Sequence, residues 1–167
     1  MKMSKRLYWN ETAVIGLSLD ANHEREMLQE CTKSFPNETG GILIGLYKQD
    51  NTIAEVTKIS GPPKDSKHGR YTFYRGTLGL IELLDEYWEK HQQYYLGEWH
   101  FHPNGKPVPS HQDILQMKQI ANSKRYNCPE PTLLIVGGHP KKQWTTSAYV
   151  FPKGKECITL PVWELGK

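Results

Sequence analysis

Apolar residues recur along this chain with two different periods, and each change of period marks a boundary between expected elements. Alternating positions and short continuous apolar runs predict strands at 7–9, 13–19, 41–47, 52–60, 71–74, 94–102, 132–137, 143–151 and 157–162. Spacings of three and four residues predict amphipathic helices at 20–34, 77–91 and 110–122. Strands and helices in this order indicate an α/β fold with a mixed, mostly antiparallel sheet.

The middle of the chain should contain a hairpin and a loop. Segment 41–47 is apolar throughout, so both faces of this strand should be buried. The Asp50-Asn51 pair after it is typical of a turn, which should join it to strand 52–60. Residues 61–70 contain two prolines and two glycines, so they should form an irregular surface loop.

Two further elements carry predictions about which side chains face the core. Those of helix 77–91 that should face inward are Leu80, Ile81, Leu84, Tyr87 and Trp88. Strand 94–102 should separate its side chains by face, because their direction alternates along a strand. The aromatic residues expected to share one face are Tyr95, Trp99 and Phe101.

The composition indicates one folded domain over residues 1–167. Apolar residues make up 37% of the chain, and the net charge of +3 is too small to predict a nucleic-acid partner. No apolar run reaches the roughly 18 residues of a membrane span, and no apolar signal core follows Lys5-Arg6, so we expect a cytoplasmic protein without a membrane partner. The cysteines lack a C-x-x-C spacing and should be reduced thiols: Cys31, Cys128 and Cys157.

The strongest candidate for chemistry is the segment that ends strand 94–102 and begins helix 110–122. His100 and His102 are separated by one residue, so their imidazoles should project from the same face of the strand. With a carboxylate from a neighbouring element they would make three protein ligands, which leaves the fourth position of a tetrahedral zinc ion open for water. A lone His-x-His pair on a strand is weak support by itself.

Asp113 is the carboxylate that this segment offers. It falls on the apolar stripe of its helix with Met117 and Ile120, where an unpaired carboxylate is costly and a cation removes that cost. The simpler interpretation is a capping pair, in which Ser110 caps the helix and Asp113 lies near the positive end of the helix dipole. The capping and ligand roles are compatible.

These residues together resemble the JAB/MPN (JAMM) zinc metallopeptidases. The motif is His100-x-His102-Pro-x6-Ser110-x-x-Asp113, preceded by Glu38 in the run Glu-Thr-Gly-Gly-Ile-Leu-Ile-Gly. The similarity extends over about residues 13–151 and is closest to the short prokaryotic JAB branch. It implies a single JAB/MPN-like domain, in which a curled mixed sheet is flanked by three helices and the site loops meet at one edge.

The resemblance also implies roles for the site residues. His100, His102 and Asp113 would hold Zn²⁺, and Glu38 would act as general base, although its local sequence alone is more typical of a solvated loop carboxylate. Ser110 would hydrogen-bond the developing oxyanion or cap the helix, and the sequence does not divide these roles. Three other residues are weaker candidates for function: Glu98, His139 and His68.

The implied function is a zinc-dependent isopeptidase or peptidase that cuts after the C-terminal tail of a ubiquitin-like or otherwise conjugated protein. In a bacterial anti-phage system of the CBASS type, its partners would be E1/E2-like proteins and a cyclic-oligonucleotide synthase. Two alternatives remain open: a non-catalytic MPN scaffold, and a RadC-like protein associated with DNA repair. The scaffold interpretation is weakened because the motif is complete.

Overall fold

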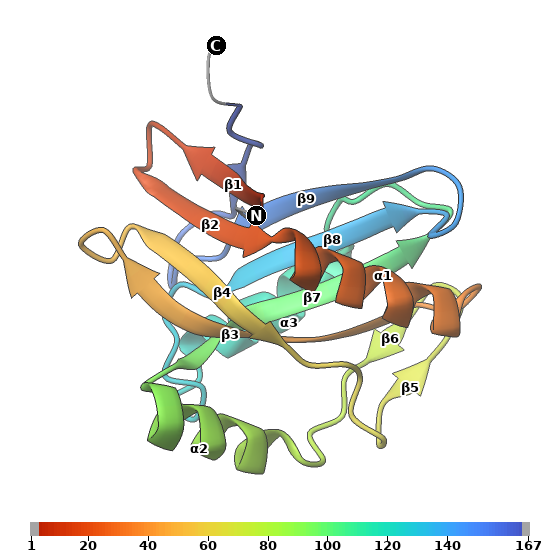
Figure 1. Cartoon of the computed structure of the whole chain (residues 1–167), viewed down its shortest axis with the longest axis horizontal. Coiled ribbons are helices and arrows are strands. Elements are labelled where there is room, and N and C mark those ends of the chain that lie inside the picture. Colours follow the sequence, from red (N-terminus) through yellow and green to blue (C-terminus); the bar gives the residue numbers. More distant parts are fainter. Residues whose placement is uncertain (1–3, 165–167) are drawn as a thin grey trace.

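A curled eight-stranded sheet is the centre of the fold (Figure 1). The computed structural model describes residues 4–164, so residues 1–3 and 165–167 of the expected domain lie outside the described residues. The elements, in chain order, are β1 (Lys5–Asn10), β2 (Ile15–Asp20), α1 (Ala21–Ser34), β3 (Thr39–Lys48), β4 (Ile53–Ile59), β5 (Lys67–His68), β6 (Phe73–Tyr74), α2 (Leu80–His91), β7 (Tyr94–Pro103), α3 (His111–Asn122), β8 (Thr132–Gly138), β9 (Trp144–Val150) and β10 (Ile158–Leu160).

The sheet is mixed, as expected, and nearly closes on itself. Its strand order is β1-β2-β4-β3-β7-β8-β9-β10. The β2–β4 and β7–β8 pairs are parallel and the others are antiparallel. Backbone bonds join the two ends of the sheet, from Trp9 N to Pro161 O at 2.8 Å and from Trp163 N to Leu7 O at 2.7 Å. These bonds cover much of β1, which would otherwise present unpaired backbone groups.

Two apolar clusters cover the two faces of the sheet. The inner cluster fills the curl together with Met27 and Cys31 of α1, and the outer cluster contains Leu80 of α2 and Met117 of α3. The expected double burial of β3 is confirmed, because Leu43 belongs to the inner cluster while the neighbouring Ile42 and Ile44 belong to the outer one. The cysteines are free thiols. Within residues 4–164, none of the helices has both the length and the apolar character needed to cross a bilayer.

The expectation that Tyr95 shares a face with Trp99 and Phe101 is wrong. The β3–β7 pairing shifts its register next to Gly97, whose φ is 153°. This bulge inserts one residue into the alternation, so Tyr95 joins the outer cluster while Trp99 and Phe101 stay in the inner one. A side chain at position 97 would lie 1.9 Å from Thr132 O, so only glycine fits this close approach.

Helix α2 is shorter and less buried than expected. It begins at Leu80 rather than near residue 77, and Ile81 and Trp88 are 57% and 52% exposed. The residues that contact the outer cluster are Leu80, Leu83, Leu84 and Tyr87. The helix packs along this one narrow stripe, so residues one position further round its axis face away from the core.

The irregular loop expected at 61–70 contains regular structure at its end. Lys67 and His68 form β5 and pair with Tyr74 and Phe73 of β6. The turn between the strands is closed by Gly69 N, which donates to Thr72 O at 2.8 Å. This β5–β6 hairpin, residues 67–74, also shortens the strand expected at 71–74, and it lies beside the C-terminal end of α1 in Figure 1.

Candidate metal centre

His100, His102 and Asp113 come together where the end of β7 meets the start of α3. Each offers a ligand atom, and these atoms all lie within 4.8 Å of one another. His100 and Asp113 are buried, at 3% and 6% exposure, and His102 is partly buried. The two-residue period of β7 turns both histidines toward α3, as the sequence predicted.

The N-terminus of α3 holds Asp113 in place through a capping box. Ser110 N donates to Asp113 Oδ2 at 2.8 Å, and Asp113 N donates to Ser110 Oγ at 3.1 Å. The predicted capping role of Ser110 is therefore confirmed. The prediction that Asp113 falls on the apolar stripe of its helix is also confirmed, because it is buried there with Met117 and Ile120.

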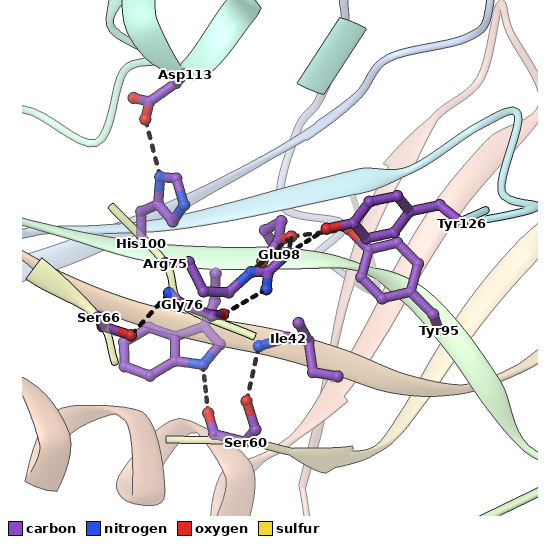
Figure 2. Close-up of polar contacts among 11 residues, drawn as sticks. Ile42, Ser60, Ser66, Arg75, Gly76, Tyr95, Glu98, His100, Asp113 and Tyr126 are labelled. Carbon is purple, nitrogen blue, oxygen red and sulfur yellow. Dashed lines mark hydrogen bonds and ion pairs between the residues drawn. The ribbon is translucent and has the colours of Figure 1, made fainter. Parts of the chain in front are cut away.

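Asp113 is bound by both histidines. Its Oδ1 lies 2.8 Å from His100 Nδ1, and its Oδ2 lies 3.2 Å from His102 Nε2 (the first contact is drawn in Figure 2). Burial opposes ionisation of Asp113, but hydrogen bonds from His100 and His102 outweigh it and hold the pKa of Asp113 well below its usual range. Burial lowers the pKa of His102, yet the net shift is upward because Asp113 and Glu38 favour its charged form.

The residues present fit a bound metal ion. His100 Nε2 is buried and has no hydrogen-bond partner among the described residues. Leaving a buried ring nitrogen without a partner costs free energy, and a metal ion bound to it would remove that cost. Two imidazoles and one carboxylate are also a donor set typical of hydrolytic zinc sites, which leave one position open. These three residues therefore fit a metal site.

Glu38 reaches the same place through the pairing of β3 with β7. Thr39 pairs with Phe101 and Gly40 with His100, so the next position of the antiparallel register sets Glu38 beside His102. Gly40 permits this approach, because a Cβ there would lie 2.9 Å from Cδ2 of the His100 ring. Burial raises the pKa of Glu38, while the charges of the two histidines act against that rise.

A cleft of about 500 Å³ opens beside these residues. Three segments that are far apart in the sequence line it: the α1–β3 connection, the turn of the β5–β6 hairpin and the β7–α3 loop. The lining residues are Pro36, Glu38, Arg70, Tyr71, His102, Pro103, Asn104, Gly105, Lys106, Val108 and Ser110. The cleft thus brings together Glu38, His102 and Ser110, three of the residues that the sequence singled out.

Glu98 shares the outer face of β7 but is occupied by another partner. Arg75 Nε donates to Glu98 Oε2 at 2.7 Å, and Tyr95 OH donates to Glu98 Oε1 at 3.0 Å (Figure 2). Arg75 Nη2 also donates to Tyr126 OH at 2.6 Å. Sequence reasoning missed Arg75; its only signal was that a carboxylate in a buried strand needs a cation.

The other two histidines considered have structural neighbours instead. His139 lies with its ring 4.5 Å from that of Phe35, outside the His100–His102–Asp113 group. His68 is exposed, as expected, but its Nδ1 lies 2.9 Å from the backbone oxygen of Glu38. Its contact is therefore with the backbone of Glu38.

A curled mixed sheet with flanking helices, and a two-histidine strand facing a capped aspartate, is the arrangement that the resemblance to JAB/MPN domains implied. The family model for prokaryotic homologs of the JAB domain matches residues 20–148. That match covers most of the chain, which therefore belongs to this family, and it confirms the resemblance found in the sequence.

Individual relatives agree with this assignment. A protein of Enterobacter hormaechei subsp. hoffmannii named CD-NTase/cGAS isopeptidase is 41% identical over 160 residues, 96% of this chain and 88% of the relative. A Pseudomonas aeruginosa protein of the same name is 30% identical over 103 residues, 60% of this chain and 63% of that protein. The solution structure of a Desulfitobacterium hafniense protein shares the fold, with a TM-score of 0.62 at 19% identity, and the match covers 84% of this chain and 87% of that one.

Proposed function

We propose that this chain is a zinc-dependent isopeptidase that hydrolyses the amide bond between the C-terminal tail of a CD-NTase and a second protein. The observation that carries the proposal is the group of His100, His102 and Asp113 beside a cleft that Glu38 also lines. The name of the Enterobacter relative supports a CD-NTase as the substrate, and the match to that relative covers 96% of this chain. Within the same proposal, the pathway is a CBASS-type anti-phage system with E1/E2-like partners.

The chain's own residues would divide the chemistry among them. His100, His102 and Asp113 would hold the zinc ion, which supplies a Lewis acid and lowers the pKa of water to roughly 7 in such sites. Glu38 would take a proton from the attacking water onto its carboxylate and deliver it to the leaving amine. Water thus adds its oxygen to the tail's carbonyl carbon, the C–N bond breaks, and the products are a carboxylate and an amine.

Ser110 can serve both the helix and the reaction. Its oxygen accepts the hydrogen bond from Asp113 N, which uses a lone pair and leaves the hydroxyl hydrogen available. No acceptor for that hydrogen is found among the described residues, and Ser110 lines the cleft. We therefore assign it a hydrogen bond to the oxyanion that develops on the substrate.

The two alternatives are less well supported. A non-catalytic MPN scaffold would not need His100, His102 and Asp113 to be brought together, nor the buried His100 Nε2 to be left without a partner among residues 4–164. A RadC-like role in DNA repair has no support from the charge of +3, which is spread over a 167-residue chain. Neither alternative accounts for Glu38 in the same cleft.

The test uses a CD-NTase whose C-terminal carboxylate is joined by an amide bond to a reporter protein. The purified chain should carry about one zinc per molecule by elemental analysis and should cleave the fusion after the last CD-NTase residue. The His100→Ala/His102→Ala variant should lose both the metal and the activity. His111→Ala is the matched control, because this histidine is exposed at the start of α3 and lies outside the ligand group. Zinc retained by the double variant, or an intact fusion with zinc-loaded protein, would refute the proposal.

A further inference from the structure

The β5–β6 hairpin places two side chains at a set position beside Glu38. Glu38 N donates to Gly69 O at 2.8 Å, and Glu38 O lies 2.9 Å from His68 Nδ1, so the hairpin is tied to both backbone groups of Glu38. Arg70 and Tyr71 occupy the middle of the turn and line the cleft, with Tyr71 82% exposed. The tip of this hairpin is therefore part of the cleft wall rather than a free loop.

The β7–α3 loop does the same for a second pair of side chains. Lys106 O accepts from Val108 N at 2.9 Å and lies 3.3 Å from His102 Nδ1, so its backbone is tied to a proposed ligand. Tyr149 OH anchors the loop to β9 by donating to Pro107 O at 2.8 Å. Lys106 and Val108 line the cleft, and Val108 is 56% exposed.

These two wall segments give the cleft an unbalanced positive charge. Among the lining residues, Arg70 and Lys106 are basic, and the only carboxylate is that of Glu38. Within residues 4–164, neither basic side chain makes an ion pair or a side-chain hydrogen bond, so both charges are available to a bound peptide. Each base has an exposed apolar side chain near it in the sequence, Tyr71 beside Arg70 and Val108 two residues after Lys106. Each of the two walls therefore carries one positive and one apolar side chain.

We propose that the tail accepted by this cleft is an acidic peptide, with a Glu or Asp and an adjoining apolar residue within the last few positions before the cleaved bond. Arg70 and Lys106 would be its specificity-determining residues, and Tyr71 and Val108 would contact the apolar position. The inference rests on the proposed function. A tail rich in Arg or Lys at the same positions would place like charges together and should be disfavoured.

The experiment compares three CD-NTase–reporter fusions whose positions two to five before the cleaved bond are acidic, neutral or basic. The zinc-loaded wild-type chain should cleave the acidic fusion fastest and the basic fusion slowest. Their kcat/KM values should differ about tenfold, because two exposed charge interactions are favourable with the acidic tail and unfavourable with the basic one. At 1 M salt the differences should largely disappear, because the screening length shrinks to about 3 Å.

The Arg70→Glu/Lys106→Glu variant should reverse the order of the three fusions. Its matched control is Lys64→Glu/Lys67→Glu, which makes the same change of charge on exposed residues of the same part of the chain that do not line the cleft. The control should keep the wild-type order. Equal cleavage of all three fusions by both the wild type and the Arg70/Lys106 variant would overturn the inference and leave the proposed function standing. Cleavage of none by the zinc-loaded wild type would reject the proposed function and this inference with it.

Discussion

Two buried polar groups meet the outer face of β7, one at Glu98 and the other at His100, and they differ in how completely their hydrogen bonds and charges are paired (Figure 2). Glu98 is fully buried, and its oxygens accept from Arg75 and Tyr95. Arg75 in turn donates to Gly76 O and to Tyr126 OH. Both charges of this first group are matched within the fold, so we expect it to serve stability and to bind nothing else.

The second group, around Asp113, is incomplete. His100 Nε2 has no partner among the described residues, and a single carboxylate serves two imidazoles while Glu38 stands nearby with a raised pKa. The difference teaches which buried charges can do chemistry on this strand. Separating the members of a fully paired buried group destabilises the protein. A ligand that supplies the missing partner of an incompletely paired group stabilises it.

The largest effect expected at the second, incomplete group comes from Glu38→Gln. This change keeps the size of the side chain but removes the proton acceptor, so turnover should fall by about 10²–10⁴ while zinc content and the free energy of unfolding stay the same. Cleavage of the CD-NTase fusion, elemental analysis and urea unfolding measure the three quantities. Glu30→Gln, on the nearby end of α1, is the control and should be fully active. Unchanged turnover in Glu38→Gln would mean that another group activates the water.

At the first group, where Arg75 and Glu98 are fully paired, removing one partner should lower the stability of the fold. Arg75→Ala leaves Glu98 buried and uncompensated, so the free energy of unfolding should drop by about 3–5 kcal/mol in urea titrations. Arg75→Met/Glu98→Leu removes both charges and should recover most of that loss. If the double variant were as unstable as Arg75→Ala, packing around the side chains would matter more than the charge pair.

Ser110 belongs to both the cap and the cleft, so it tests the contrast at a single residue. Ser110→Ala should lower the rate by about 10²–10³, the usual cost of one oxyanion donor. It should also lower the free energy of unfolding by about 1 kcal/mol through the lost cap. Ser110→Thr keeps the hydroxyl and should preserve both values. A loss of stability without any loss of rate would restrict Ser110 to capping.

The last prediction concerns the effect of the metal on stability. Free zinc at 100 times its dissociation constant should raise the free energy of unfolding by about 2.7 kcal/mol, because only the folded chain brings the ligands together. A chelator should reverse this gain. Arg75→Met/Glu98→Leu should show the same gain from zinc, and His100→Ala/His102→Ala should show none. Stabilisation of the histidine variant by zinc would place the metal elsewhere.

Much of the site follows from short spacings in the sequence. The His-x-His spacing turned two imidazoles to one face because side-chain direction on a strand alternates from residue to residue. The Ser110–Asp113 spacing predicted the capping box because its bonds join residues three apart. Apolar periods also located the three helices and the β3–β4 hairpin. Each of these features depends on interactions among residues close in the chain.

The tertiary structure decided how distant residues meet. The bulge at Gly97 moved Tyr95 to the face of Glu98, and the narrow contact of α2 left Trp88 exposed. Only the register of β3 against β7 brings Glu38 beside His102, and only the β5–β6 hairpin delivers Arg75 to Glu98. These contacts join residues separated by 23 positions or more, as with Arg75 and Glu98. Local periodicity carries no information about such pairings, because they are chosen by the packing of the whole sheet and its helices.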